Sequence, residues 1–300
     1  MGGLNDSVVT EFVLLALSCS WEKKFFLILI CFLLYLGVIV GNVLILFLVI
    51  FDSHLHSPMY FLLANLSLID VGLSSTTVPK IITDLLYEYT LISFKSCMTQ
   101  ICFIHIIGGV EMVLLIAMAF DRCTAICKPL HYLNIMNPKI CILFVLTGWV
   151  TGVIHAMSQF LFLPFCGSRE LDSFFCDITL VIKLACMDSH ILEMLINANS
   201  GILATICFIL LLISSSYILF TVRFHSKDGA SKALSLCTAH IAVVVLFFEA
   251  CIFTHLWPLS ITWVDNFLAV FYAVITPLQN PAIYTLRNKE IRNAVKRLQC

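Results

Sequence analysis

Long apolar segments alternate with short polar connectors along the chain, and this pattern predicts the secondary structure. A helix that crosses the hydrocarbon core of a bilayer needs about 20 mostly apolar residues. Segments of that length, bounded by charges, prolines or polar clusters and without the alternation of a membrane β-strand, cover 25–51, 58–86, 98–120, 140–163, 192–222, 234–257 and 267–286. We therefore predict an all-α membrane protein, a bundle of seven transmembrane helices.

The composition also indicates a membrane-embedded chain. Of its 300 residues, 61% are hydrophobic and 12% are charged, whereas a soluble domain has about a quarter of its residues charged. Membrane lipid is therefore an expected partner. The formal net charge of −1 argues against binding to nucleic acid, which needs a basic face. The chain shows no internal repeat, which disfavours a transporter built from inverted repeats.

Basic residues predict the orientation in the membrane. The first, third and fifth connectors plus the tail hold 11 Lys and Arg residues, and the N-terminus with the remaining connectors holds 6. Since the more basic side is usually cytoplasmic, we expect the N-terminus outside and the tail inside, although Lys23 and Lys24 run against this assignment. Asn5 begins an Asn-x-Ser glycosylation sequence, which is used only outside the cell. The predicted domains are an extracellular segment (1–24), the transmembrane domain (25–286) and a cytoplasmic amphipathic tail helix (287–300).

Four cysteines lie outside or at the edge of the apolar segments. Cys97 opens the third segment, and Cys166, Cys176 and Cys186 fall in the connector between the fourth and fifth. All four are expected on the oxidising side of the membrane, where disulfides persist. Four cysteines allow three pairings, and spacing alone does not choose between them. A bridge from Cys97 would hold the connector across the mouth of the bundle as a lid.

Ionisable residues inside a bilayer are costly, and Asp70, Glu111 and Glu249 lie within apolar segments. Asp70 is expected to form a polar site that holds a cation such as sodium, or waters; the alternative is a protonated acid with polar neighbours. Glu111 follows Gly108 and Gly109, whose missing side chains permit either close helix packing or space for a ligand.

No chemistry-bearing motif points to an enzyme. The span histidines, His105 among them, lack the spacing of a helical zinc site, and no nucleophile elbow or phosphate-binding glycine loop is present. We therefore predict no catalytic residue, no metal cofactor and no other cofactor. Two glycine pairs, Gly37 with Gly41 and Gly148 with Gly152, are expected to mark contacts between helices of the same bundle.

The third and seventh segments carry, at their cytoplasmic ends, polar residues that suit a conformational switch. Asp121 and Arg122 close the third segment, where they can pair with each other or Arg122 can reach an acceptor on a partner. Asn280, Pro281 and Tyr284 end the seventh, where proline frees a backbone carbonyl and permits a kink. Beyond them, residues 287–298 predict a short amphipathic helix on the inner leaflet.

At this point the sequence resembles the rhodopsin-like (class A) G-protein-coupled receptors, and among them the olfactory (odorant) receptors. The matching stretches are PMYFL (58–62), LSLID (66–70), MAFDR (118–122), AICKPLHY (125–132), SY (216–217), KALS (232–235) and NPAIYTLRN (280–288).

The resemblance implies a receptor that binds small volatile odorants and activates a heterotrimeric stimulatory G protein, which raises cyclic AMP. It implies the disulfides Cys97–Cys176 and Cys166–Cys186. It also implies that Asp70, Asp121, Arg122, Tyr217, Asn280, Pro281 and Tyr284 form the activation switches. The implied ligand contacts, for which core packing is the alternative at each apolar position, are His105, Gly108, Gly109, Met112, Asp177, Ile178, Ile202, Thr205, Phe248, Cys251, His255, Val270 and Ala273.

Several residues depart from the family pattern. Phe120 and Cys123 replace tyrosines around the Asp-Arg pair, and Gln279 replaces a leucine. Ala250 follows Glu249 where the family often has proline, so the sixth helix is expected to bend less. These departures bear on coupling efficiency, not on the fold. Glu249 can either select amines or pack as an interhelical acid. A channel that uses Asp70 and Glu111 as a permeation path is the alternative function.

Overall fold

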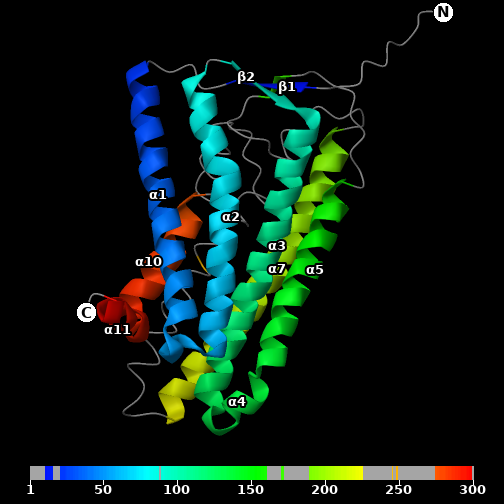
Figure 1. Cartoon of the computed structure of the whole chain (residues 1–300). Coiled ribbons are helices and arrows are strands. Elements are labelled where there is room, and N and C mark those ends of the chain that lie inside the picture. The colour runs from blue at the N-terminus through cyan, green and yellow to red at the C-terminus, as the bar shows by residue number, and fades with distance from the viewer. Residues whose placement is uncertain are drawn as a thin grey trace, which may run out of the picture.

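The computed structural model describes residues 11–15, 21–87, 89–160, 170–171, 189–225, 245, 248 and 274–298. These residues form a bundle of long helices that run roughly side by side (Figure 1). The helices are α1 (Trp21–Phe51), α2 (Pro58–Leu86), α3 (Phe94–Cys127), α4 (Tyr132–Ile135), α5 (Pro138–Phe160), α7 (Ser189–His225), α10 (Thr276–Arg287) and α11 (Lys289–Leu298), with 3-10 turns η1 (Ser53–Leu55) and η2 (Pro129–His131).

Among the described helices, α1, α2, α3, α5 and α7 are each long and apolar enough to cross a membrane. They coincide with the first five segments predicted from the apolar pattern. Residues 276–286 of the seventh predicted segment form most of α10. The sixth predicted segment, 234–257, lies outside the described residues except for positions 245 and 248.

Helix ends differ from the predicted segments because a helix continues past the hydrocarbon layer. α1 begins at Trp21 and takes in Glu22, Lys23 and Lys24, four residues before the apolar run. α7 begins at Ser189 and ends at His225, beyond the predicted segment at both ends. Hydropathy reports where apolar side chains lie, whereas backbone hydrogen bonds continue until a cap or a break ends them.

A small three-stranded sheet is an addition that the apolar pattern did not predict. Strand β1 (Glu11–Leu15) lies between β2 (Tyr89–Ser93) and β3 (Glu170–Leu171). β1 pairs antiparallel with β2, with Glu11 opposite Ser93, and parallel with β3, with Val13 opposite Glu170. Its strands are short and far apart in sequence, so local patterning gave no signal for them. We call this end of the bundle the sheet end, and the opposite end, with η1, α4 and α11, the tail end (Figure 1).

α3 is the central helix of the described part, since it packs against α2, α5 and α7. Large apolar side chains on the outer faces of α1, α5 and α7 are exposed, whereas polar residues such as Asn42, Asp70 and Glu111 are buried. This arrangement is the reverse of a soluble globule and matches a bundle whose surroundings are lipid.

Glycines permit the closest helix contacts. A Cβ atom added at Gly109 of α3 would lie 2.6 Å from the Cα of Gly152 in α5, and one added at Gly152 would overlap the carbonyl oxygen of Ile106. A Cβ at Gly41 of α1 would lie 3.0 Å from Pro281 of α10. The prediction that the glycine pairs mark contacts within the bundle is confirmed.

Candidate functional site

A polar cluster lies in the middle of the bundle and joins three helices. The Asn280 side chain of α10 donates a 2.9 Å hydrogen bond to the Asp70 carboxylate of α2. The Asn42 side chain of α1 donates to the carbonyl of Val38 in its own helix and to that of Pro277 in α10, both at 3.0 Å. Asn42, Asp70 and Asn280 are all fully buried, so these bonds tie α1, α2 and α10 together away from water.

Glu111 of α3 brings a second carboxyl group to this cluster. It is buried, and it lies close enough to Asp70 for the two side chains to interact electrostatically. Three side-chain oxygens of the cluster, Asp70 Oδ1, Asn42 Oδ1 and Asn280 Oδ1, are buried without a hydrogen-bond partner among the described residues. A group of oxygen acceptors around two carboxyls suits a hard cation such as sodium, or ordered waters.

A second polar cluster lies at the tail end of α3. The Tyr132 hydroxyl of α4 donates a 2.7 Å hydrogen bond to the buried Asp121 carboxylate. Burial, and then the nearby Asp121 carboxylate, raise the pKa of Tyr132, so the hydroxyl keeps its proton and stays a donor. Arg122 Nη2 is buried without a hydrogen-bond partner among the described residues. Asp121 is therefore held by a tyrosine, while Arg122 has a donor available for an acceptor supplied elsewhere.

The junction of α10 and α11 is fixed to the start of α2. The Tyr60 hydroxyl donates a 2.7 Å bond to the Glu290 carboxylate, and the Asn288 side chain donates to the Tyr60 oxygen at 2.9 Å. Asn288 caps this turn, because its side-chain oxygen accepts from the backbone N–H of Glu290. Tyr284 is buried one turn earlier. Tyr60 and Asn288 stand inside the matched family stretches, but sequence reasoning assigned them no role.

α11 is also held by an ion pair that sequence reasoning missed. Arg297 Nε donates to Asp52 Oδ2 at 3.0 Å, and His54 lies on the other carboxylate oxygen at 2.9 Å. The hydrogen bond from Arg297 lowers the pKa of Asp52 to about 2, despite partial desolvation. The two charges are 245 residues apart in sequence, so no local signal indicated the pair.

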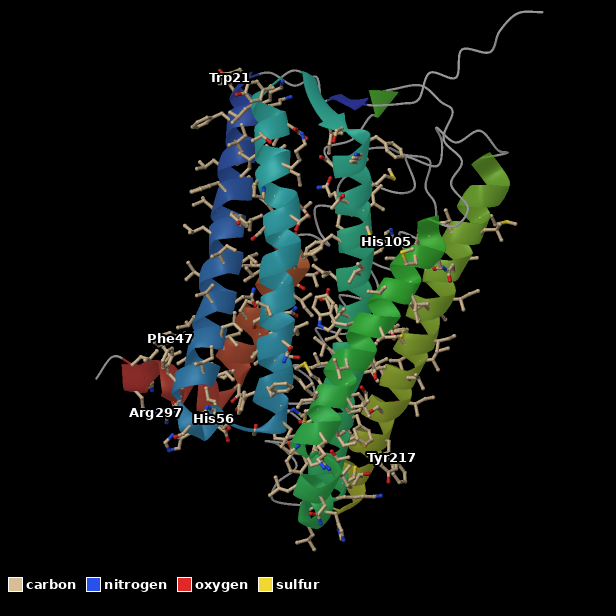
Figure 2. All side chains as sticks on the ribbon, turned by 45° about the vertical axis from the view of Figure 1, so that its right-hand side comes forward. Trp21, Phe47, His56, His105, Tyr217 and Arg297 are labelled. Atoms are coloured by element: carbon tan, nitrogen blue, oxygen red, sulfur yellow. The ribbon has the colours of Figure 1, made fainter. Side chains whose placement is uncertain are left out.

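The described ligand-contact candidates gather where α3, α5 and α7 approach one another. His105 is half-buried on α3 (Figure 2), and its ring packs edge-on against His155 of α5, with centroids 5.5 Å apart. Met112 is buried about two helical turns further along α3. Phe248 is fully buried and packs against Phe208 of α7 with ring centroids 5.7 Å apart.

Thr205 and the α5–α7 contact supply polar groups near these candidates. Thr205 is half-buried on α7 and donates to the carbonyl of Gly201 at 2.7 Å. The Gln159 side chain of α5 donates to Ser200 at 3.0 Å, and Asn199 donates to Ser158 at 2.8 Å. The sequence analysis did not single out these four residues, although each is a polar position next to or inside an apolar run.

Three candidate residues are placed differently from their predicted roles. Gly109 is in contact with Gly152 of α5, so its missing side chain serves helix packing and leaves no room for a ligand there. Gly108 beside it is half-buried. The Ile202 side chain is 58% exposed on α7, and Tyr217 is 54% exposed near the tail end, where Figure 2 shows it on the outer face. Neither side chain lies in the polar clusters or among the buried candidates, because helical rotation turns these positions outward.

Cys97 is buried and disulfide-bonded. The other cysteines in the described part form no disulfide, so the partner of Cys97 lies outside that part. Cys166, Cys176 and Cys186 fall outside the described residues, and the pairings Cys97–Cys176 and Cys166–Cys186 stay predictions. The other candidates outside the described residues are Asn5, Asp177, Ile178, Glu249, Ala250, Cys251, His255, Val270 and Ala273.

Similarity to known proteins decides the family. The sequence model of the olfactory receptor family matches residues 30–300. The chain belongs to the olfactory receptor family. It is 52% identical to human olfactory receptor 4K2 over 98% of this chain and 95% of that one, and 54% identical to human olfactory receptor 4F4 over 97% of both. It is also 51% identical to human olfactory receptor 4K1 over all of this chain and 97% of that one.

Family membership confirms the main predictions from the sequence. This olfactory receptor is a class A G-protein-coupled receptor with the seven-helix membrane fold, and it is a multi-pass membrane protein. Its family consists of receptors, so the chain is not an enzyme. Its role is in olfaction and sensory transduction, and the receptor binds odorants.

Proposed function

We propose that this receptor binds small, mostly hydrophobic odorants inside the bundle and activates a stimulatory G protein, which raises cyclic AMP. The observation that carries the proposal is that one helix, α3, bears both the buried ligand candidates and the tail-end cluster. His105 and Asp121 are separated by about 24 Å along the helix axis at 1.5 Å per residue. A shift or rotation of α3 therefore acts at both places.

The ligand candidates suit apolar molecules with one polar group. Met112 and Phe248 offer apolar surface, while His105 and Thr205 offer groups that orient a hydroxyl or a carbonyl. A ligand that binds one arrangement of the helices better shifts the population toward it, and only by its difference in affinity for the two arrangements. We extend the same assignment to Cys251, His255, Val270, Ala273, Asp177 and Ile178.

We infer that the sheet end is extracellular and the tail end is cytoplasmic. Under this orientation Asn5 is accessible for glycosylation, and Cys97 lies in the oxidising compartment, which supports the predicted disulfides. Arg122 then meets the G protein at the tail end, where Nη2 has no partner among the described residues.

The polar cluster at Asp70 is proposed to regulate the switch by holding sodium. Asp70 and Glu111 would supply carboxylate ligands, and the side-chain oxygens of Asn42 and Asn280 have free acceptor capacity. A bound sodium ion would neutralise charge between the two carboxyls and keep the helices of the cluster together.

Replacement of Arg122 tests the coupling. Cells that express the receptor with its G protein are screened for cyclic AMP against a chemically broad odorant panel, and surface expression is measured in parallel. Arg122→Ala should abolish the odorant-dependent signal while the protein still reaches the surface. Lys139→Gln, an exposed change at the same end of the bundle, should signal like wild type. Full signalling by Arg122→Ala would contradict the proposal.

The channel alternative makes the opposite prediction. If Asp70 and Glu111 line a permeation path, odorant should produce ion flux in cells that lack the G protein. The receptor proposal expects no flux and no cyclic AMP in those cells.

Selection of amines by Glu249 is a separate part of the proposal. An ionised carboxyl in the sixth segment would prefer an amine to an alcohol of the same shape. The amine-to-alcohol preference should be lost in Glu249→Gln; an unchanged preference would mean that Glu249 packs between helices instead.

A further inference from the structure

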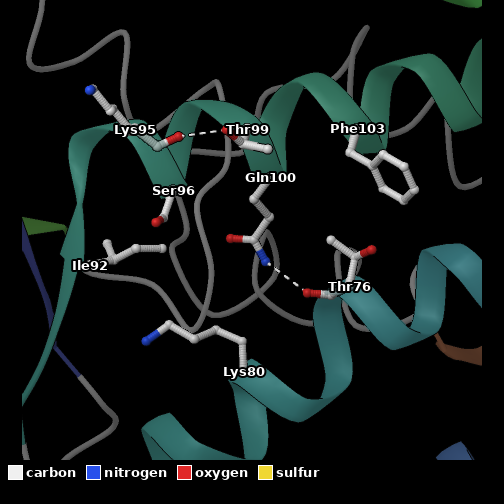
Figure 3. A pocket seen from close by; sticks show the side chains of 8 residues that line it. All are labelled: Thr76, Lys80, Ile92, Lys95, Ser96, Thr99, Gln100 and Phe103. Carbon is white, nitrogen blue, oxygen red and sulfur yellow. Dashed lines mark hydrogen bonds between the residues drawn. The ribbon is translucent and has the colours of Figure 1, made fainter.

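A cavity of about 520 Å³ lies at the sheet end, apart from the ligand candidates described above. α2, the first turns of α3 and strand β2 form its walls (Figure 3). The described residues that line it are Thr76, Lys80, Ile92, Lys95, Ser96, Thr99, Gln100 and Phe103. None of these lining residues is acidic, and two of them are lysines.

The cavity carries positive charge from two sides. Lys80 of α2 is half-buried and forms a 2.6 Å ion pair with the buried Asp84, which holds the ammonium group in place without covering it. Lys95 of α3 is exposed at the rim, where its ammonium group is directed away from the cavity (Figure 3), and it forms no ion pair with another described residue. Asp84 offsets one of the two charges, so the described residues leave a net charge of about +1 next to the cavity.

Hydrogen-bond donors in the cavity add to this preference for an anion. Ser96 Oγ already accepts from Ser93 at 2.8 Å, which leaves its own hydrogen to donate. Thr99 donates to the Lys95 carbonyl at 2.8 Å, so its hydroxyl is occupied. The amino-terminal turn of α3 begins here, with Ser93 as its cap, and the helix dipole favours negative charge at this end.

Apolar surface lies beside the donors. Ile92 of β2 is buried, and the Phe103 ring stands two turns along α3 from Lys95. Figure 3 shows Lys80, Ser96 and Gln100 directed into one space, with Ile92 on one side and Phe103 at the far end. A ligand with an anionic head and a short apolar tail matches this division of the cavity.

We propose that this cavity binds small carboxylates with an alkyl chain, with the carboxylate beside Lys80 and Ser96, the positive charge of Lys95 at the rim, and the chain against Ile92 and Phe103. This site is distinct from the odorant positions on α3, which begin at His105. Binding at this site does not require a G protein, so it is independent of the signalling proposed above.

The test measures equilibrium binding of radiolabelled octanoate to the full-length receptor in nanodiscs of zwitterionic phospholipid. Wild type should bind octanoate saturably and should prefer it to octan-1-ol and octylamine as competitors. Lys95→Gln should weaken binding about threefold to fivefold, the range for a solvent-exposed ion pair. Lys23→Gln, at the same end of the bundle but outside the cavity, should bind like wild type. Equal competition by octan-1-ol, or unchanged binding by Lys95→Gln, would overturn the proposal.

Three further variants separate lost binding from lost folding. Lys80→Gln removes the ion-pair partner of buried Asp84 and risks misfolding, so Lys80→Arg is used beside it to keep the pair. Ser96→Phe leaves both lysines in place but fills the cavity, and it should abolish binding while its thermal melting stays like that of wild type. Octanoate binding by a folded Ser96→Phe variant would place the ligand elsewhere and overturn the proposal.

Lipid headgroups carry the same anionic chemistry, and the nanodisc composition distinguishes the two sources. Octanoate binding should be unchanged when anionic phospholipid replaces part of the zwitterionic lipid. Displacement of octanoate by anionic lipid would identify a lipid as the occupant and would overturn the assignment to a soluble carboxylate.

Discussion

Single side chains set the tail-end cluster. Asp121 is 1% exposed. Within the described part, Tyr132 is the one side chain that donates a hydrogen bond to its carboxylate. A buried acceptor that loses its donor stays desolvated without a hydrogen bond, and this destabilises the fold. The raised pKa of Tyr132 keeps this donor protonated at neutral pH.

Tyr132→Phe should lower the free energy of unfolding by about 1 to 2 kcal/mol, because Asp121 keeps its burial and loses a donor. The measurement is thermal unfolding of the purified receptor in detergent. Tyr87→Phe is the matched control, since Tyr87 is 64% exposed at the sheet end, and it should change stability by less than about 0.5 kcal/mol. Equal melting of the two variants would show that the Tyr132 contact contributes nothing.

Two glycines with different surroundings give a paired prediction. Gly152→Ala should destabilise the receptor by about 1 to 3 kcal/mol, because the new Cβ overlaps the carbonyl of Ile106 and forces α3 and α5 apart. Gly72→Ala places its Cβ 3.6 Å from Ile107, an ordinary contact, and should be neutral or stabilising through better helix propensity. Thermal unfolding and surface expression of both variants check the prediction; a tolerated Gly152→Ala would mean that the two helices separate at little cost.

At the scale of elements, α11 is positioned by contacts at both of its ends. Tyr60 and Asn288 hold its start against α2, and the Asp52–Arg297 pair holds its last turn against the end of α1. The amphipathic pattern of residues 289–298 accounts for a helix on a surface. The direction in which that helix runs is set by these tertiary contacts.

Asp52→Asn should loosen the last turn of α11, because Arg297 loses its charged acceptor. Hydrogen–deuterium exchange of the amides in 289–298 should become faster in the variant, while α2 exchanges like wild type. Glu22→Gln, an exposed acid at the sheet end, is the control and should leave α11 unchanged. Identical exchange in Asp52→Asn would show that Tyr60 and Asn288 suffice to hold the helix.

The same pair predicts a pH dependence. The pKa of Asp52 is lowered from 3.8 to about 2 in the folded receptor. A carboxyl with a lowered pKa stabilises the fold above its ordinary pKa, and this contribution is lost as the pH falls toward the folded-state value. After correction for intrinsic exchange rates, the difference between wild type and Asp52→Asn should be constant from about pH 8 to pH 5 and should disappear between about pH 4 and pH 2. A difference that already fades near pH 6 would show that ionisation of Asp52 does not account for it.

At the scale of the whole molecule, the receptor places apolar side chains toward lipid and concentrates its buried polar groups between helices. The cluster of Asn42, Asp70, Glu111 and Asn280 joins α1, α2, α3 and α10. A displacement of one of these helices therefore alters contacts with the other three. This is the kind of shared contact through which two arrangements of a bundle are distinguished.

Sodium should stabilise the wild-type receptor through this cluster. At a sodium concentration about ten times its dissociation constant, linkage predicts a gain of about 1.4 kcal/mol and a rise in melting temperature of about 3 °C. Replacement of sodium by choline at constant ionic strength should remove the gain, and Asp70→Asn should be insensitive to the exchange. An equal salt response in Asp70→Asn would show that the ions act elsewhere.

Much of this receptor follows from its sequence alone. The apolar segments determine that it spans a membrane with helices, because every backbone polar group in lipid must be paired within its own helix. The family stretches at 118–132 and 280–288 determine the receptor class. Local signals of this kind need only neighbouring residues, and they single out Asp70, Asp121 and Asn280 as candidate switch residues.

Tertiary structure alone decided which side chains meet. The bond from Asn280 to Asp70, the pair of Asp52 with Arg297 and the lysine-lined cavity between α2 and α3 join residues far apart in sequence or on different elements. It also decided that Gly109 packs against Gly152 and that Ile202 faces outward. Sequence periodicity gives the face of a helix but not its partner, because the rotation and approach of two helices depend on every side chain between them.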